Sequence, residues 1–143
     1  MTRTVLQAAL FAAATTLAAC SSMPDWMPGS GAHKVSLTGA EEVPPVSTQA
    51  KGSGSFRIAD DGAISGSVST SGMTGMMAHI HMAEKGKNGP VIVPLSKEGE
   101  TWSVPKDKKL TAEQVKAFKE GRLYVNVHSA AHKGGEIRAQ LQP

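Results

Sequence analysis

The sequence predicts an all-β domain, an antiparallel β-sandwich or Greek-key barrel with one short inserted helix. Three observations support this fold class. The chain holds 15 glycines among 143 residues, which is typical of short strands joined by tight turns. Apolar and polar residues alternate in several short stretches, as they do in strands with one buried face. A single stretch, residues 111–120, has the start and stop signals of a helix.

The first predicted strand opens the folded part of the chain. Val35 and Leu37 alternate with polar residues, which predicts a strand that begins near Lys34. Pro44 and Pro45 follow, and they interrupt any ladder because proline has no backbone N–H to donate. We therefore expect a loop before the second strand.

The clearest hairpin joins residues 54–59 to residues 63–70. Phe56 and Ile58 alternate with polar residues, and the turn at residues 60–62 reads Asp-Asp-Gly. Such a turn between two alternating stretches is typical of an antiparallel hairpin. Further strands are expected at residues 78–82, 90–95, 101–104, 123–128 and 137–141.

One helix is predicted, over about residues 111–120. Thr111 is a favourable N-cap, and Gln114 three residues later completes a capping box. Gly121 follows the last turn, where a left-handed residue is favoured. A helix this short is expected to cover the sheet with its apolar face.

The first 19 residues have the pattern of a secretory leader. Arg3 precedes an apolar run at residues 5–14, and small residues follow it. The run is far shorter than the ~20 residues that a membrane-spanning helix needs. We therefore expect residues 1–19 to be a signal peptide of an exported protein.

Cys20, the sole cysteine in the chain, directly follows Leu-Ala-Ala. This arrangement resembles the bacterial lipobox, and the resemblance implies that Cys20 is lipidated and anchors the protein to a membrane. Ser21 and Ser22 follow in place of an aspartate, which in the Gram-negative sorting pattern that this stretch resembles implies a periplasm-facing position at the outer membrane and not retention at the inner membrane. Residues 20–33 would be a flexible tether, and residues 34–143 the folded domain.

Several function classes are disfavoured by the residue inventory. The formal net charge is only +3 and the basic residues are spread along the chain, which argues against a nucleic-acid partner. The chain has no Gly-x-Ser-x-Gly elbow, no phosphate loop and no paired carboxylates in a histidine-rich setting. We therefore expect a protein that is not an enzyme.

The stretch at residues 76–82, Met-Met-Ala-His-Ile-His-Met, is the strongest candidate for a functional site. If it is a strand, Met77, His79 and His81 share one face, and the apolar residues share the other. Two imidazoles two residues apart on a strand can bind one metal ion. A solvated pair of histidines is the alternative.

A third imidazole comes from a later predicted strand. Alternation over residues 123–128 places His128 on a polar face. Three histidines from two strands suit copper or zinc. Met77 is a candidate fourth ligand that would favour Cu(I) over Zn, because zinc rarely takes a thioether. His132 is a further candidate ligand or an exposed side chain.

Five motifs follow one another over nearly all of the mature chain: residues 37–45 (LTGAEEVPP), 79–81 (HIH), 89–95 (GPVIVPL), 123–129 (LYVNVHS) and 134–141 (GGEIRAQL). In sequence and in order they resemble the motifs of the CHRD (chordin-type) domain family. The resemblance implies a fold akin to that of Cu/Zn superoxide dismutase and, in bacterial members, copper binding at the positions of His79, His81 and His128. His132 departs from the family pattern.

Three functions remain open from the sequence. The first is an envelope lipoprotein that binds copper, as Cu(I) or Cu(II), for tolerance, buffering or delivery, with zinc less favoured. The second is a structural or adhesive protein-interaction module in which the histidines have no metal. The third is a weak redox enzyme with a single copper, for which the chain offers no specific residue pattern.

Overall fold

The computed structural model describes residues 31–143. The predicted leader, the lipidation site Cys20 and nearly all of the tether lie outside this range. Within the described residues, no helix is both long enough and apolar enough to cross a membrane.

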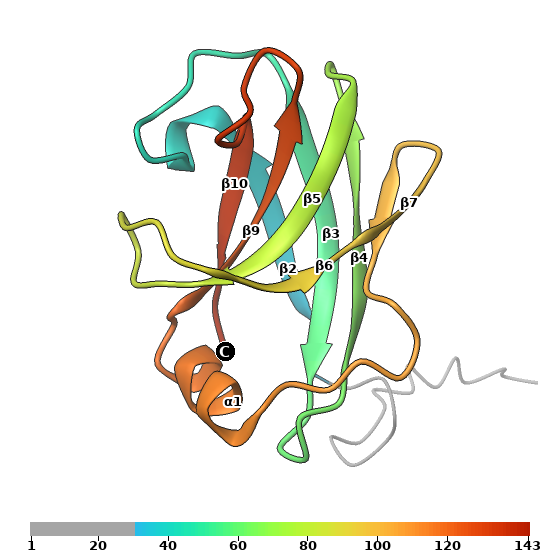
Figure 1. Cartoon of the computed structure of the whole chain (residues 1–143), viewed down its shortest axis with the longest axis vertical. Helices are drawn as coiled ribbons and strands as arrows, with labels where there is room; N and C mark the ends of the chain where they lie inside the picture. Colours follow the sequence, from blue (N-terminus) through green and yellow to red (C-terminus); the bar gives the residue numbers. More distant parts are fainter. Residues whose placement is uncertain (1–30) are drawn as a thin grey trace, which may run out of the picture. The chain divides into compact units, whose positions relative to one another are not determined.

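The described chain forms one antiparallel sheet of nine strands, in the order β6-β5-β9-β10-β2-β3-β4-β8-β7, together with one α-helix (Figure 1). This confirms the all-β fold class. A short 3-10 helix, η1 (Gly39–Glu41), follows the first strand. The strands are β2 (His33–Thr38), β3 (Lys51–Ile58), β4 (Ile64–Ser71), β5 (Gly75–Met82), β6 (Val91–Pro94), β7 (Ser96–Glu98), β8 (Thr101–Ser103), β9 (Leu123–Ser129) and β10 (Ile137–Leu141).

The two edge strands, β6 and β7, are consecutive in the chain and are separated by Leu95 alone. The backbone N–H of Leu95 donates to the carbonyl of Ala78 at 2.9 Å, and the Lys97 ammonium donates to the carbonyl of Gly75 at 2.6 Å. This segment therefore runs from one edge of the sheet to the other and nearly closes it into a barrel. The sequence did not predict β7, whose three residues are all exposed.

The barrel interior is built from the alternating apolar residues of the strands. Alternation predicted the buried positions of Val35, Leu37 and Phe56, and these side chains are at most 6% exposed. Trp102 of β8 is also buried. Burial of such side chains is the main favourable contribution to folding.

The helix α1 (Ala112–Lys119) has the predicted ends and lies at one end of the barrel (Figure 1). The Gln114 N–H donates to the Thr111 hydroxyl, and the Thr111 N–H donates to the Gln114 side chain, which confirms the capping box. Gly121 has a φ of +67°, as predicted for the residue after the helix. The ring of Phe118 packs edge-on against His33, the first residue of β2.

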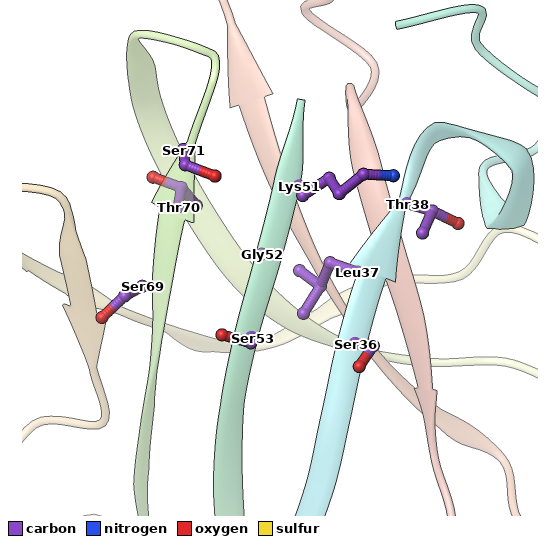
Figure 2. Close-up of a pocket in the computed structure, with 9 residues that line it drawn as sticks. All are labelled: Ser36, Leu37, Thr38, Lys51, Gly52, Ser53, Ser69, Thr70 and Ser71. Carbon is purple, nitrogen blue, oxygen red and sulfur yellow. The ribbon is translucent and has the colours of Figure 1, made fainter. Parts of the chain in front are cut away.

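The outer face of β2, β3 and β4 is polar and solvated. Ser36, Ser53 and Ser69 are register partners across these strands, and all three are exposed. They line a shallow hollow of about 380 Å³ (Figure 2). Its lining contains no histidine, cysteine or carboxylate, so this face offers no usual metal ligand.

The outer face of β9 is covered instead of solvated. Its outward residues Tyr124, Asn126 and His128 are each at most 7% exposed. Three loops provide the cover, at residues 39–46, 83–90 and 130–136, and they are tied to the sheet and to one another by hydrogen bonds. This part of the barrel therefore has a second buried layer, which is polar.

Candidate metal centre

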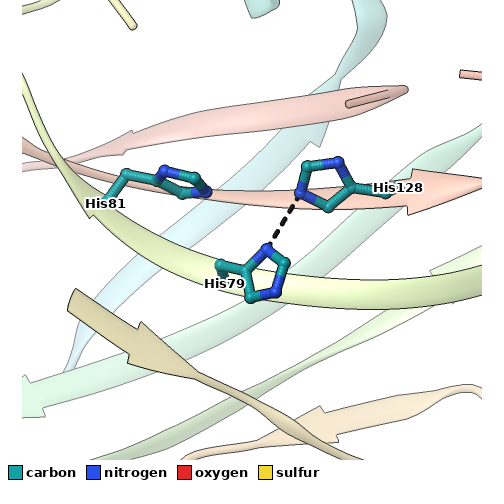
Figure 3. A group of neighbouring side chains, drawn as sticks. All are labelled: His79, His81 and His128. Carbon is teal, nitrogen blue, oxygen red and sulfur yellow. Dashed lines mark hydrogen bonds between the residues drawn. The ribbon is translucent and has the colours of Figure 1, made fainter. Parts of the chain in front are cut away.

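Three histidines meet in this polar layer. His79 and His81 come from β5, and His128 comes from the neighbouring strand β9 (Figure 3). Each offers one ring nitrogen, and the three nitrogens lie within 4.8 Å of one another. The predicted alternation of β5 is confirmed, since Ala78 and Ile80 face the core.

Hydrogen bonds fix the tautomers of two of the rings. Nδ1 of His81 lies 2.9 Å from the carbonyl oxygen of Gly89, and Nδ1 of His128 lies 2.9 Å from that of Lys133. A carbonyl can only accept, so each Nδ1 carries the proton and each Nε2 keeps a free lone pair. Metal-binding histidines have this arrangement, in which the second nitrogen donates to a fixed oxygen.

His79 completes the group by a direct contact with His128. Its Nδ1 lies 3.0 Å from Nε2 of His128. Because that Nε2 is an acceptor in the neutral ring, Nδ1 of His79 is the donor. A metal ion bound by all three rings would replace this hydrogen bond, and His79 would then carry its proton on Nε2.

Nε2 of His81 is buried and has no hydrogen-bond partner among the described residues. A buried polar atom without a partner costs free energy, and a ligand bound beside the two other imidazoles would remove that cost. The donor set of three neutral nitrogens fits copper or zinc.

The pKa values of the three histidines also favour metal binding. Burial lowers the pKa of His79, His81 and His128 below the ordinary value of 6.5. The neighbouring imidazoles lower the pKa of His79 further, whereas the carbonyl contacts partly oppose the effect at His81 and His128. All three rings are therefore neutral near pH 7, which is the state that binds a metal.

A stack of side chains supports His81. Its ring lies parallel to that of Tyr124, with centroids 4.7 Å apart and an interplanar angle of 5°. The guanidinium of Arg138 lies 3.4 Å from the centroid of the Tyr124 ring. Tyr124 is on the strand between those of His81 and Arg138, so one aromatic ring connects the imidazole to the buried cation.

Arg138 also holds the loop that fixes the His81 tautomer. The side chain is 1% exposed and donates to the carbonyl of Lys87 at 2.9 Å and to the Asn88 side chain at 3.2 Å. The next residue, Gly89, accepts from His81 and donates to the Tyr124 hydroxyl at 3.3 Å. Arg138 is thus connected to His81 through both the stack and the loop.

A buried carboxylate lies beside this network. Glu42 is 4% exposed, and burial raises its pKa, while the charge of Arg138 opposes the increase. Oε1 of Glu42 and Oδ1 of Asn126 are buried without partners among the described residues. A Cβ on Gly135 would lie 2.3 Å from Oε1 of Glu42, so the loop after β9 packs directly on the carboxylate.

The other predicted site residues lie near the three histidines but are not part of the same group. Met77 is the cross-strand partner of His128, and its side chain is 50% exposed. His132 lies in the loop after β9, where its N–H donates to the Ser129 hydroxyl; it is outside the group of three. Met82 was not a predicted ligand, and it packs against the core, as strand alternation predicts.

Sequence reasoning missed the residues that orient the ligands. The carbonyls of Gly89 and Lys133 have no signature in the sequence, because any residue has a carbonyl. The position of Arg138 could have been predicted from the sequence, since alternation along β10 places it on the outer face beside β9. Arg138 donates to the Lys87 carbonyl and to the Asn88 side chain. Glu136, two residues earlier in the chain, accepts from the Thr48 hydroxyl at 2.7 Å.

The fold and the site together define a class: an all-β domain with a three-histidine candidate metal centre under its loops. The family model of the CHRD domain matches residues 34–141. The chain therefore belongs to the CHRD domain family, as its motifs indicated. Searches of the curated proteins and of the solved structures found no match.

Proposed function

We propose that this protein binds copper at His79, His81 and His128, and that it serves copper tolerance, buffering or delivery at the bacterial envelope. The observation that carries the proposal is the convergence of three ring nitrogens within 4.8 Å, two of them on rings whose tautomers are fixed by backbone carbonyls. The role is binding and not catalysis.

Copper is favoured over zinc by the neighbouring donor atoms. Imidazole suits both metals, but thioethers select Cu(I), and Met77 lies directly across the strand pair from His128. The CHRD family resemblance in bacterial proteins points to the same metal.

We further propose that the protein is exported and held at the outer membrane by lipid on Cys20. The apolar leader and the Leu-Ala-Ala-Cys sequence at residues 17–20 support this position. A lipid anchor would keep the domain in the periplasm, where the tether gives it reach.

The experiment that tests copper binding is a competition titration with a chromophoric chelator, under anaerobic conditions for Cu(I) and in air for Cu(II). We expect one ion per chain, and a loss of affinity of at least about 100-fold when His79 and His81 are both replaced by alanine. His33→Ala is the matched control, because His33 packs on Phe118 away from the three rings, and its affinity should equal that of the native protein.

The same experiment separates this proposal from an interaction module without a metal. Copper should raise the melting temperature of the native protein and not that of the double variant, since a ligand stabilises only the state that binds it. Equal affinities of the native protein and the double variant would refute the proposal.

A further inference from the structure

Two consecutive methionines are exposed where a regular strand would bury one of them. Met76 is 60% exposed and Met77 is 50% exposed. Side chains of adjacent strand residues normally point to opposite faces, but the pairing of β5 with β9 shifts register between Gly75 and Met77. This bulge leaves both methionines at the surface.

Both methionines line one pocket, of about 280 Å³, together with Ser129, Ala130 and Lys133. The residues that line this pocket are neighbours of His128, either along the chain or across the strand pair. Met77 is the register partner of His128, Ser129 follows His128, and the carbonyl of Lys133 accepts from Nδ1 of His128. A group bound between the methionines would therefore lie next to a ligand ring of the centre.

The chemistry of this pocket suits a soft, singly charged cation. A thioether is a polarizable neutral ligand that binds Cu(I) and discriminates against zinc. Lys133 also lines the pocket, and a lysine charge at its rim would penalise a doubly charged ion twice as much as a singly charged one. Packing in the core does not explain these two methionines, because both side chains are largely exposed.

We propose that Met76 and Met77 form a capture site for a soft monovalent metal ion, Cu(I) or Ag(I), at the entrance to the histidine centre. This inference rests on the proposed function, since the captured ion would pass on to the imidazoles. The ion keeps its oxidation state throughout, so the step is a ligand exchange in which nitrogen replaces sulfur. Exposure of the pair lets the ion exchange quickly with solvent.

The test compares Ag(I), a redox-inert probe of soft sites, with Zn(II), whose usual protein ligands are Cys, His and Asp or Glu and which rarely takes a thioether. The mature protein, in the form that cells produce, is purified in detergent. Both ions are then titrated by competition against a chelator. The variant is Met76→Leu with Met77→Leu, which retains the apolar character and approximate volume of the pocket. We expect Ag(I) affinity to fall at least tenfold and Zn(II) affinity to stay within twofold of the native value.

X-ray absorption at the silver edge supplies a second readout. We expect sulfur scatterers around Ag(I) in the native protein and their loss in the double leucine variant. Unchanged Ag(I) affinity with no sulfur scatterers would overturn the inference. A parallel fall in Zn(II) affinity would also overturn it, because the methionines would then be shaping the histidine centre and not binding the ion.

The His79→Ala, His81→Ala double variant distinguishes this inference from the proposed function. Loss of Zn(II) and Cu(II) binding in that variant supports the histidine centre, whatever the leucine variant shows. If sulfur scatterers around Ag(I) are still present in the same variant, this supports the capture site independently of the histidine centre.

Discussion

Nδ1 of His79 lies 3.0 Å from Nε2 of His128, across the neighbouring strands β5 and β9. The Nδ1–H of His128 already donates to the carbonyl of Lys133. The lone pair on Nε2 of His128 therefore accepts the hydrogen bond from His79. A metal ion competes with a single hydrogen bond for these two nitrogens. Such a bond contributes only about 1 kcal/mol net, which a metal bound by three rings easily exceeds.

The first prediction concerns His128 and its neighbour His132. His128→Ala removes one of three converging nitrogens, and we expect copper affinity to fall by at least about 100-fold. His132→Ala should change the affinity by less than threefold, because His132 is outside the group of three. Competition titration measures both, and an equal loss in the two variants would show that His132 is also a ligand.

The second prediction is the pH dependence of stability without metal. The folded pKa of each histidine is below the ordinary 6.5, so between the folded pKa and 6.5 the unfolded chain binds more protons than the folded one. The free energy of unfolding should therefore rise with pH in that window. The contribution of the three neutral histidines to it is fully present above pH 6.5 and is lost as the pH falls through their folded pKa values. Urea unfolding between pH 5 and pH 8 measures the slope.

The control for this slope is the variant in which all three histidines are replaced by glutamine. Its free energy of unfolding should depend less on pH between about 5 and 6.5. Copper affinity of the native protein should fall over the same range, because protons and metal compete for the same nitrogens. An affinity that is constant from pH 7 to pH 5 would contradict the neutral-imidazole site.

The third prediction concerns Arg138 as the support of His81. Arg138→Met keeps an apolar stem over Tyr124 but leaves the Lys87 carbonyl and Glu42 without the guanidinium. We expect a loss of about 3 kcal/mol in unfolding free energy and a copper affinity reduced about 10- to 100-fold. Chemical denaturation and competition titration measure the two effects.

Arg122→Met is the matched control for this substitution. Arg122 forms an ion pair with Glu120 at the surface, so its loss should cost less than about 1 kcal/mol and leave copper affinity unchanged. If Arg138→Met lowers stability but leaves both affinity and the NMR signals of the His81 ring unchanged, Arg138 does not position His81.

The fourth prediction compares two adjacent glycines in the loop that covers the centre. Gly135 has a φ of +129°, and an added Cβ would clash with the Glu42 carboxylate and the Asn126 amide. We expect Gly135→Ala to cost about 3 kcal/mol. Gly134→Ala has no atom within 4 Å of its Cβ and should change stability by less than about 0.5 kcal/mol. Thermal unfolding distinguishes the two, and equal costs would contradict the packing of this loop.

Local patterns determined much of the fold from the sequence alone. The period-2 alternation placed His79 and His81 opposite Ile80, because side-chain direction in a strand depends only on the neighbouring backbone. The Thr111 capping box and Gly121 set the ends of α1 for the same local reason. The three-residue strand β7 was not predicted, since its side chains are all exposed and show no alternation.

The sequence by itself determined the residue types of the site and the strand faces on which they lie. Only the tertiary structure decided that His128 meets His79, because the pairing of β5 with β9 joins segments far apart in the chain. It also decided which ring nitrogen faces the centre, since that depends on two loop carbonyls, at Gly89 and Lys133. A carbonyl belongs to every residue, so its position is set by long-range contacts such as those of Arg138 and not by local sequence.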